Sequence, residues 1–118
     1  MSGPRPTRIV MHSASHVLEV GFDTGEVFRL PAEYLRVESP SAEVQGHGPG
    51  QKLLVGGKKH VNIDHVVPVG QYAVLLRFND GHETGIYSWK LLYELGTGQA
   101  ERFDKYLAAL ETAGMGRS

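Results

Sequence analysis

The strongest constraint on the fold of this chain is an internal repeat, in which two segments follow the same order of strand, turn, strand and helix. The segments are residues 17–37 and residues 72–96. In each, apolar and polar residues alternate around a turn that contains glycine, and a short helical pattern follows. Each unit alone would expose an apolar face, so we expect the two units to pack together. Four pairs of residues share an offset of 56 residues: Phe22 and Phe78, Gly25 and Gly81, Leu30 and Ile86, and Leu35 and Leu91.

The turns and helix ends of the two units carry recognisable signals. In the first unit the turn lies at residues 23–25, and Pro31 has a φ that suits the first turn of a short helix. In the second unit the turn lies at residues 79–81, Ser88 is the expected N-cap of the helix, and Gly96 is its expected C′ residue. Both units therefore contain a hairpin followed by a short helix.

Two strands are predicted between the units. One is a short strand at Lys52 to Val55. The other lies in residues 60–70, where alternation predicts that one face carries valine and isoleucine. His65 interrupts this strand, and we expect it to form a hydrogen bond within the core or at its edge. The residues predicted to share the apolar face are Val61, Ile63, Val67 and Val69.

The C-terminal segment shows the spacing of an amphipathic helix over about residues 98–113, closed by Gly114. We expect Met115 to Ser118 to fray. Together these patterns predict an α+β fold of antiparallel hairpins and short helices, arranged as two strand-turn-strand-helix units plus a C-terminal amphipathic helix. With 118 residues, we expect a single domain over residues 1–118 that buries enough surface to fold without a disulfide or a metal.

Composition excludes several classes of function. The chain has no cysteine, which rules out disulfides, thiolate zinc sites, cysteine-ligated iron-sulfur clusters and thiol nucleophiles within it. A net charge of -1 argues against nucleic acid as a partner, since phosphate binding usually needs a basic excess. The N-terminal residues lack the apolar core of a signal peptide, and no run of 18 apolar residues occurs, so we expect no membrane partner and a soluble cytoplasmic protein.

No catalytic pattern stands out, and we expect no catalytic residues and no resident cofactor. None of the histidines has the spacing of a helical zinc motif, and the glycines at residues 46–50 are not followed by a helix that could face a phosphate. We expect most of the histidines to be structural or solvated. The six histidines are His12, His16, His47, His60, His65 and His82.

Two stretches, "FRLPAEYLRVESPSAEVQGHGPGQ" and "FNDGHETGIYSWKLLYELG", resemble the N-terminal domain of gamma-butyrobetaine hydroxylase. The resemblance covers about residues 17–96, and its motifs S-P-S-A-E-V-x-G-H-G-P-G and G-I-Y-S-W are specific. Members of this family occur as free-standing bacterial proteins of unassigned function. The same module is fused to carnitine-pathway oxygenases and to ATPases that carry iron-sulfur clusters.

The resemblance implies that the loop after the first helix is related to a zinc-binding loop. In the oxygenase this loop has the form C-P-C-x-x-C and binds zinc together with a histidine of the second hairpin. Here Ser39, Ser41 and Val44 stand in place of the cysteines, and His82 stands in place of the histidine. Serine is a poor zinc ligand and one imidazole cannot hold the ion, so we expect this degenerate site to bind no metal.

The resemblance does not extend to catalysis. The residues after the module offer no arrangement of two histidines and a carboxylate for iron, so we expect no oxygenase activity and no enzyme. The leading interpretation is an accessory or protein-interaction module with an unidentified protein partner, linked through family fusions to iron-sulfur cluster carriers or oxygenases. The alternative is a zinc- or iron-binding protein that uses His82 with His47 or His60.

The lack of thiolate ligands predicts that the protein folds fully without metal. Because the apolar faces are sufficient for folding, adding EDTA should leave the melting temperature unchanged. The measurement is a thermal melt of tag-free protein with and without chelator. A drop of several degrees with EDTA that zinc or iron restores would contradict the prediction.

Overall fold

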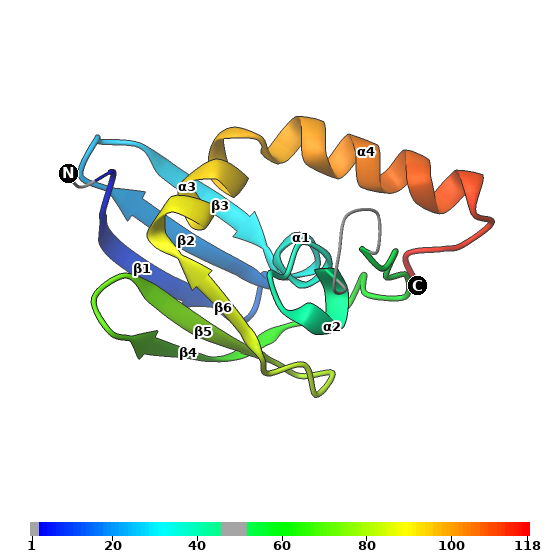
Figure 1. Cartoon of the computed structure of the whole chain (residues 1–118), viewed down its shortest axis with the longest axis horizontal. Helices are drawn as coiled ribbons and strands as arrows, with labels where there is room; N and C mark the ends of the chain where they lie inside the picture. Colours follow the sequence, from blue (N-terminus) through cyan, green and yellow to red (C-terminus); the bar gives the residue numbers. More distant parts are fainter. Residues whose placement is uncertain (1–2, 46–51) are drawn as a thin grey trace.

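The computed structural model describes residues 3–45 and 52–118 and confirms the α+β fold. Two antiparallel three-stranded sheets, ordered β1-β2-β3 and β4-β5-β6, are combined with short helices and a longer C-terminal helix (Figure 1). In chain order the elements are β1 (Pro6–His12), β2 (Val17–Phe22), β3 (Val27–Pro31), α1 (Ala32–Val37), α2 (Ala42–Gln45), β4 (Ile63–Val69), β5 (Ala73–Phe78), β6 (Gly85–Ser88), α3 (Trp89–Thr97) and α4 (Gln99–Thr112).

The repeat predicted from the sequence is present, and it is longer than the sequence pattern indicated. Each unit has a further strand, β1 or β4, on the outer side of its hairpin. In β1 the register shifts between Pro6 and Arg8, and in β4 it shifts between Ile63 and His65. A bulge of this kind leaves one residue unpaired and bends the strand. The two sheets therefore share the same strand order and the same irregularity.

The predicted equivalence of the two turns is correct. Gly25 has a φ of 92° and Gly81 has a φ of 91°, a region in which glycine is favoured because it has no Cβ. Phe22 and Phe78 precede these turns and are 3% and 4% exposed. Up to this point the offset between the units is 56 residues.

After the second turn the offset becomes 57, which makes two of the predicted pairs wrong. Leu18 pairs with Leu30, whereas the equivalent Val74 pairs with Tyr87 and not with Ile86. Leu30 and Tyr87 are both fully buried, while Ile86 is 50% exposed. One extra residue between the turn and β6 causes the shift, because pairing in a strand has a period of two and an insertion exchanges the two faces.

The same shift carries into the helices that follow. Pro31 and Ser88 occupy the N-cap positions of α1 and α3. Leu35 of α1 is therefore equivalent to Leu92 of α3, and both are fully buried, whereas Leu91 is half-buried. Ser88 caps α3 as predicted, since its side chain accepts a hydrogen bond from the backbone N–H of Leu91.

The two units bury their apolar faces in one shared core. Two tyrosines connect the units through this core: the Tyr34 hydroxyl donates to the Leu95 carbonyl at 2.7 Å, and the Tyr87 hydroxyl donates to the Leu35 carbonyl at 2.5 Å. Each bond joins residues of different units, so each unit satisfies polar groups of the other. The core includes Leu18, Val20, Phe22 and Leu30 of the first sheet and Val74, Leu76, Phe78 and Tyr87 of the second.

The segment before the second unit differs from its prediction. Lys52 to Val55 do not form a strand and instead run beside α4, where the Val55 carbonyl accepts a hydrogen bond from Tyr106. In β4, Val61 and Ile63 are buried as predicted, but Val67 and Val69 are 39% and 37% exposed. The bulge between Ile63 and His65 reverses the alternation along the strand, and this reversal turns the later valines outward.

The end of α3 is also different from the prediction. Gly96 is not the C′ residue, since α3 continues to Thr97 and the following Gly98 is the cap. A Cβ at Gly96 would lie 2.4 Å from the ring of Phe28. The glycine at this position is required because β3 approaches the helix closely, and not because of its backbone conformation.

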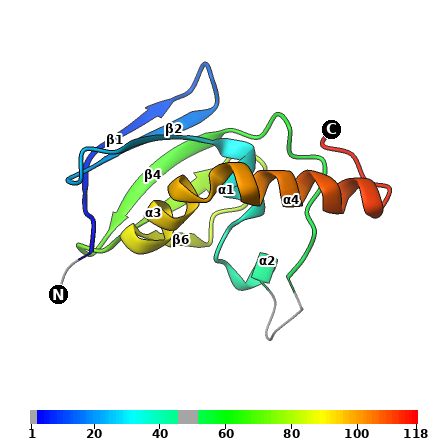
Figure 2. The same ribbon diagram turned by 90° about the horizontal axis from the view of Figure 1, so that it is seen from above.

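The C-terminal helix is present as α4, and Gly114 after it has a φ of 69°. Figure 2 shows that α4 extends past the sheets, on the side where α1 and α2 lie. The C-terminal residues after α4 pack against the rest of the protein, so the prediction that Met115 to Ser118 fray is wrong. Arg117 makes two hydrogen bonds, of 3.0 and 2.6 Å, to the carboxylate of Glu33, which is only 5% exposed. Buried carboxylates need such a partner, which explains why the tail is held.

None of the helices among residues 3–45 and 52–118 is long and apolar enough to cross a membrane.

The shared core predicts that truncating Phe22 or Phe78 to alanine will each cost about 3 to 5 kcal/mol of unfolding free energy, since both rings are buried at equivalent positions. Chemical denaturation of the two variants measures this cost. Val27→Ala is the matched control, because Val27 is 61% exposed, and it should change stability little. A near-neutral effect at either phenylalanine would contradict the account of a core shared by two units.

Candidate functional site

The structure brings together the loop after α1 and the turn between β5 and β6, which are about 40 residues apart in the sequence. All four residues that the resemblance assigns to a degenerate zinc site are buried. Ser39 is fully buried, and Ser41, Val44 and His82 are 8%, 1% and 5% exposed. The side chain of Ser39 contacts His82 directly, with 2.9 Å between Oγ and Nε2. The loop and the histidine therefore meet inside the protein.

Hydrogen bonds fix the orientation of the His82 ring. Nδ1 lies 3.0 Å from a carboxylate oxygen of Glu43, which can only accept a hydrogen bond, so Nδ1 carries the proton. Nε2 is then the acceptor for the hydroxyl of Ser39. Carboxylates commonly orient metal-binding histidines in this way. Glu43 therefore orients the His82 ring, while Ser39, Ser41 and Val44 lie at the positions where the resemblance implies cysteines.

The loop holds its shape through its own hydrogen bonds. The Ser39 hydroxyl accepts the backbone N–H of Ser41 at 3.2 Å, and the amide of Gln45 donates to the Ser39 carbonyl at 2.7 Å. The hydroxyl of Ser41 lies 2.6 Å from that of Thr84, and this contact connects the loop to the start of β6. These contacts connect the loop to itself and to the second unit.

Electrostatics favour the neutral form of His82. Burial lowers the pKa of its imidazole, and the nearby guanidinium of Arg36 lowers it further, which outweighs the opposite effect of Glu43 and Asp80. A neutral imidazole leaves the Nε2 lone pair free, as the hydrogen bond from Ser39 requires.

Asp80 sets the shape of the turn that carries His82. Its carboxylate accepts the backbone N–H of His82 and ion pairs with Arg36 at 2.8 Å and Lys58 at 2.7 Å. Burial by itself would raise the pKa of Asp80, but the hydrogen bonds from Lys58, His82 and Arg36 outweigh it and lower the pKa to about 2. Asp80 is therefore ionised at neutral pH and holds the turn in place.

Sequence reasoning missed three residues of this site, namely Glu43, Thr84 and Gly85. Glu43 lies in the loop that the resemblance identified. Its contact with His82 could not be predicted, because the two residues are far apart in the sequence. At Gly85, a Cβ would lie 2.7 Å from the Ser39 hydroxyl, so only glycine leaves room for the serine. The signal that could have found Gly85 is its position beside the turn of the second unit.

The bonds from Ser39 to His82 and from His82 to Glu43 follow the order of a nucleophile, base and acid in a hydrolase triad. The environment does not suit such a reaction. Ser39 has no exposed surface, and its hydroxyl also accepts the Ser41 N–H. A substrate carbonyl cannot reach the hydroxyl in this structure, so the arrangement is a buried hydrogen-bond network.

The other histidines lie apart from this site. His12 is in β1 and pairs with Glu19, and Nδ1 of His16 donates to the Val61 carbonyl at 3.0 Å. Both are ordered by β1 and its turn. The side chain of His65 is exposed and makes no hydrogen bond to a described residue, which makes its predicted bond in the core or at its edge wrong.

The alternative of a metal site that uses His82 with His47 or His60 gains no geometry from the structure. His60 is exposed, and His47 lies outside the described residues. Within residues 3–45 and 52–118, histidine, cysteine, aspartate and glutamate form no group of three or more that could hold a metal ion.

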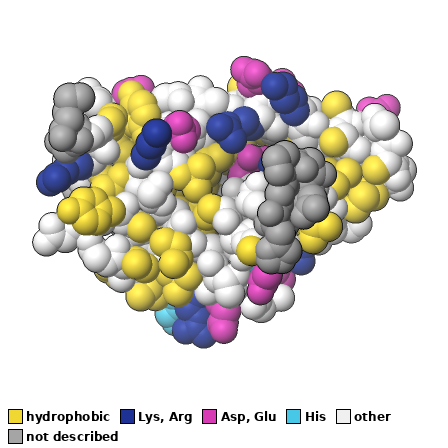
Figure 3. Space-filling view, viewed as in Figure 1, with side chains coloured by type: hydrophobic (Ala, Val, Ile, Leu, Met, Phe, Trp, Pro, Cys, Tyr) yellow, Lys and Arg dark blue, Asp and Glu magenta, His cyan; other side chains and the backbone are white. Residues whose placement is uncertain are grey.

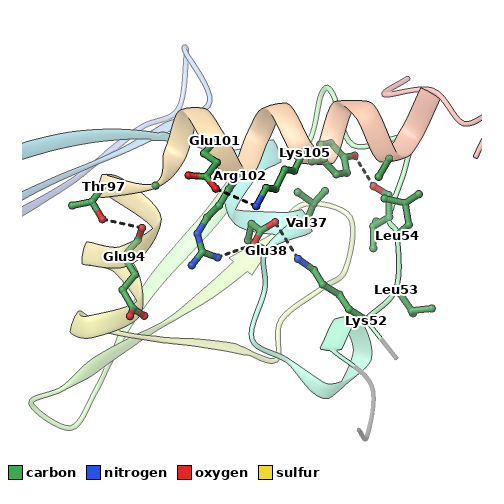
Figure 4. A pocket seen from close by; sticks show the side chains of 14 residues that line it. Val37, Glu38, Lys52, Leu53, Leu54, Glu94, Thr97, Glu101, Arg102 and Lys105 are labelled. Carbon is green, nitrogen blue, oxygen red and sulfur yellow. Dashed lines mark hydrogen bonds and ion pairs between the residues drawn. The ribbon is translucent and has the colours of Figure 1, made fainter. Parts of the chain in front are cut away.

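A groove of about 780 Å³ lies between α4, the end of α1 and residues 52–55 (Figure 4). Leu53 is 58% exposed at this groove. Charged side chains line it in pairs, with Glu38 bonded to both Lys52 and Arg102 at 3.1 and 3.3 Å. The groove combines exposed apolar surface with a polar border, as protein-binding surfaces do.

Fold and site together define a small α+β module with two repeated units and a buried contact between the loop after α1 and His82. The comparison with protein families agrees with this description: residues 9–93 match the family described as gamma-butyrobetaine hydroxylase-like, N-terminal. The chain belongs to this family. No curated protein matches it.

Solved structures resemble the chain over most of its length. One protein solved by NMR in solution is 44% identical with a TM-score of 0.86, covering 99% of this chain and 92% of its own. Another NMR structure is 49% identical with a TM-score of 0.84, covering 98% of this chain and 86% of its own. A crystal structure from Acidithiobacillus ferrooxidans, of a DUF971 protein of unknown function, is 43% identical with a TM-score of 0.69, covering 80% of this chain and 98% of its own.

The geometry of the loop predicts that cysteine substitutions can create a metal site in it. Replacing Ser39, Ser41 and Val44 by cysteine should create a Cys₃His site, because Ser39 already contacts Nε2 of His82 and Glu43 already orients the ring. We expect one zinc per chain in the triple variant, measured by elemental analysis after dialysis, and none in the parent.

The control for this experiment is the addition of His82→Ala to the triple variant, which should weaken zinc binding strongly. If the triple variant binds no zinc while it remains folded, the loop does not have the shape of a metal site.

Proposed function

We propose that the protein is a non-catalytic accessory module that acts through contacts with another protein. Its partner belongs to the classes to which the family is fused, foremost the ATPases that carry iron-sulfur clusters. The observation that carries this proposal is the loop-histidine site, in which the chemically capable residues are buried and bonded to one another. A residue that no substrate can reach supports a structural role, and this leaves the surface to carry the function.

The groove beside α4 is the surface that we assign to this partner. It is lined by Leu53, Leu54 and Val55 on one side and by α4 on the other. Tyr106 fixes the groove wall through its bond of 2.6 Å to the Val55 carbonyl. A wall fixed in advance lowers the entropy cost of binding. The charged pairs at the border would set the orientation of the partner.

The proposal predicts that Leu53→Asp weakens binding to a purified ATPase of the iron-sulfur carrier class, measured by isothermal titration. We expect a loss of at least about tenfold in affinity, because the substitution puts a charge into an apolar contact. The melting temperature should not change, since Leu53 is 58% exposed.

Val27→Asp is the matched control, because Val27 is equally exposed at 61% but lies in β3, away from the groove. It should leave the affinity unchanged. Absence of binding by the parent, or equal loss in both variants, would contradict the proposal.

A further inference from the structure

A second pocket, which we call the aromatic pocket, lies where the residues before β1, the turn between β4 and β5 and the first turns of α3 meet. Its volume is about 640 Å³, which is within the range of small-molecule sites. Three aromatic side chains line it, those of Tyr72, Trp89 and Tyr93, together with Pro4. The aromatic pocket is separate from the groove beside α4, although Glu94 lies at the border of both.

Hydrogen bonds fix two of the three aromatic side chains. The indole N–H of Trp89 donates to the Gln71 carbonyl at 2.7 Å, and the backbone N–H of Trp89 donates to the Tyr72 carbonyl at 2.9 Å. The hydroxyl of Tyr93 donates to the carboxylate of Glu26. Aromatic walls that are already fixed lose little freedom when they receive a flat apolar group. The pocket is therefore formed before a ligand arrives.

The third aromatic side chain, Tyr72, is left open to solvent. It is 70% exposed, more than any other large hydrophobic residue among residues 3–45 and 52–118. In Figure 3, hydrophobic side chains lie beside lysine or arginine side chains at the left end of the molecule, near the start of the chain. A ligand in the pocket would cover part of the Tyr72 ring and remove apolar surface from water.

The charges of the pocket are distinctive because its cations are unpaired. Within the described part of the chain, all of the 12 lysines and arginines except three form ion pairs with carboxylates. The three exceptions are Arg5, Lys59 and Lys90, and two of them, Arg5 and Lys90, line the aromatic pocket. Glu94 is the one carboxylate among the lining residues, so positive charge is in excess there.

We propose that the aromatic pocket binds a small molecule with a planar apolar body and an anionic group. The planar body packs against Trp89 and Tyr93, and the anionic group pairs with Arg5 and Lys90. Hydrogen bonds from a guanidinium or an ammonium to an anion are among the strongest in proteins, and apolar surroundings strengthen them further. The proposal does not depend on the protein partner assigned to the groove.

Other kinds of ligand fit the pocket less well. Aromatic rings also attract organic cations, but Arg5 and Lys90 would repel a cation here. A neutral ligand would gain the apolar contacts and leave both positive charges without a partner. A planar anion uses the rings and the cations together.

The test is a fluorescence titration that uses Trp89 as the reporter, because it is the only tryptophan in the chain. The probe is anilinonaphthalene sulfonate, which has a planar apolar body and one negative charge, and phenylnaphthylamine is the neutral probe of the same body. We expect the sulfonate to bind at one site and to quench Trp89. Arg5→Gln/Lys90→Gln should weaken the sulfonate at least about tenfold and leave the neutral probe nearly unchanged.

Tyr72→Ala is the second variant, and it should weaken both probes because it removes an apolar wall. All three substituted side chains are exposed, so the variants should fold, which circular dichroism establishes. Competition with naphthoate and naphthyl phosphate then identifies the preferred anionic group, since the one that displaces the sulfonate at the lower concentration matches the site better.

Lys59→Gln is the matched control, because Lys59 is the third unpaired cation and is exposed outside the pocket. It should bind the sulfonate as the parent does. The proposal is overturned if the sulfonate does not quench Trp89 up to about 1 mM, if the folded double variant binds it like the parent, or if Lys59→Gln weakens it equally. Failure of both naphthyl anions to displace the sulfonate would also overturn it.

Discussion

The rest of the structure depends on the mutual burial of the two units. Each three-stranded sheet has one apolar face, which would be exposed to water if its unit stood alone. The two faces meet in one core, and Tyr34 and Tyr87 carry hydrogen bonds across it from one unit to the carbonyls of the other. Because those carbonyls lie near the ends of helices, where partners within the helix are missing, the bonds fix the helices as well as the sheets.

The buried site follows from this arrangement. Packing of the units brings the loop after α1 against the turn between β5 and β6, and the extra residue after that turn places Thr84 and Gly85 where they can meet Ser41 and Ser39. In this site Ser39 and Glu43 fix the orientation of the His82 ring through hydrogen bonds. Buried hydrogen bonds of this kind make the loop rigid, because each polar group in it depends on its partners.

The repeat also shows where two similar units have come to differ. Their inner faces are alike because both must fill one core, whereas their outer faces are free to change, since a solvated position places few demands on packing. The outer face of the first unit carries an ion-pair network around Glu19. The outer face of the second unit carries an apolar row that includes Leu75. The difference between the outer faces therefore reflects what each face contacts and not how it folds.

The sequence by itself determined the local structure: both hairpins, their glycine turns, the start of α1, the Ser88 cap and the C-terminal helix, because these depend on residues that are neighbours in the chain. The resemblance to a known family indicated which residues meet at the loop, and the structure placed Ser39 beside His82. Only the tertiary structure decided the bulge that turned Val67 outward, the approach of Phe28 that requires Gly96, the Glu43 partner of His82 and the docking of Arg117 on Glu33. Each of these depends on a contact between distant segments, and no local pattern in the chain records such a contact.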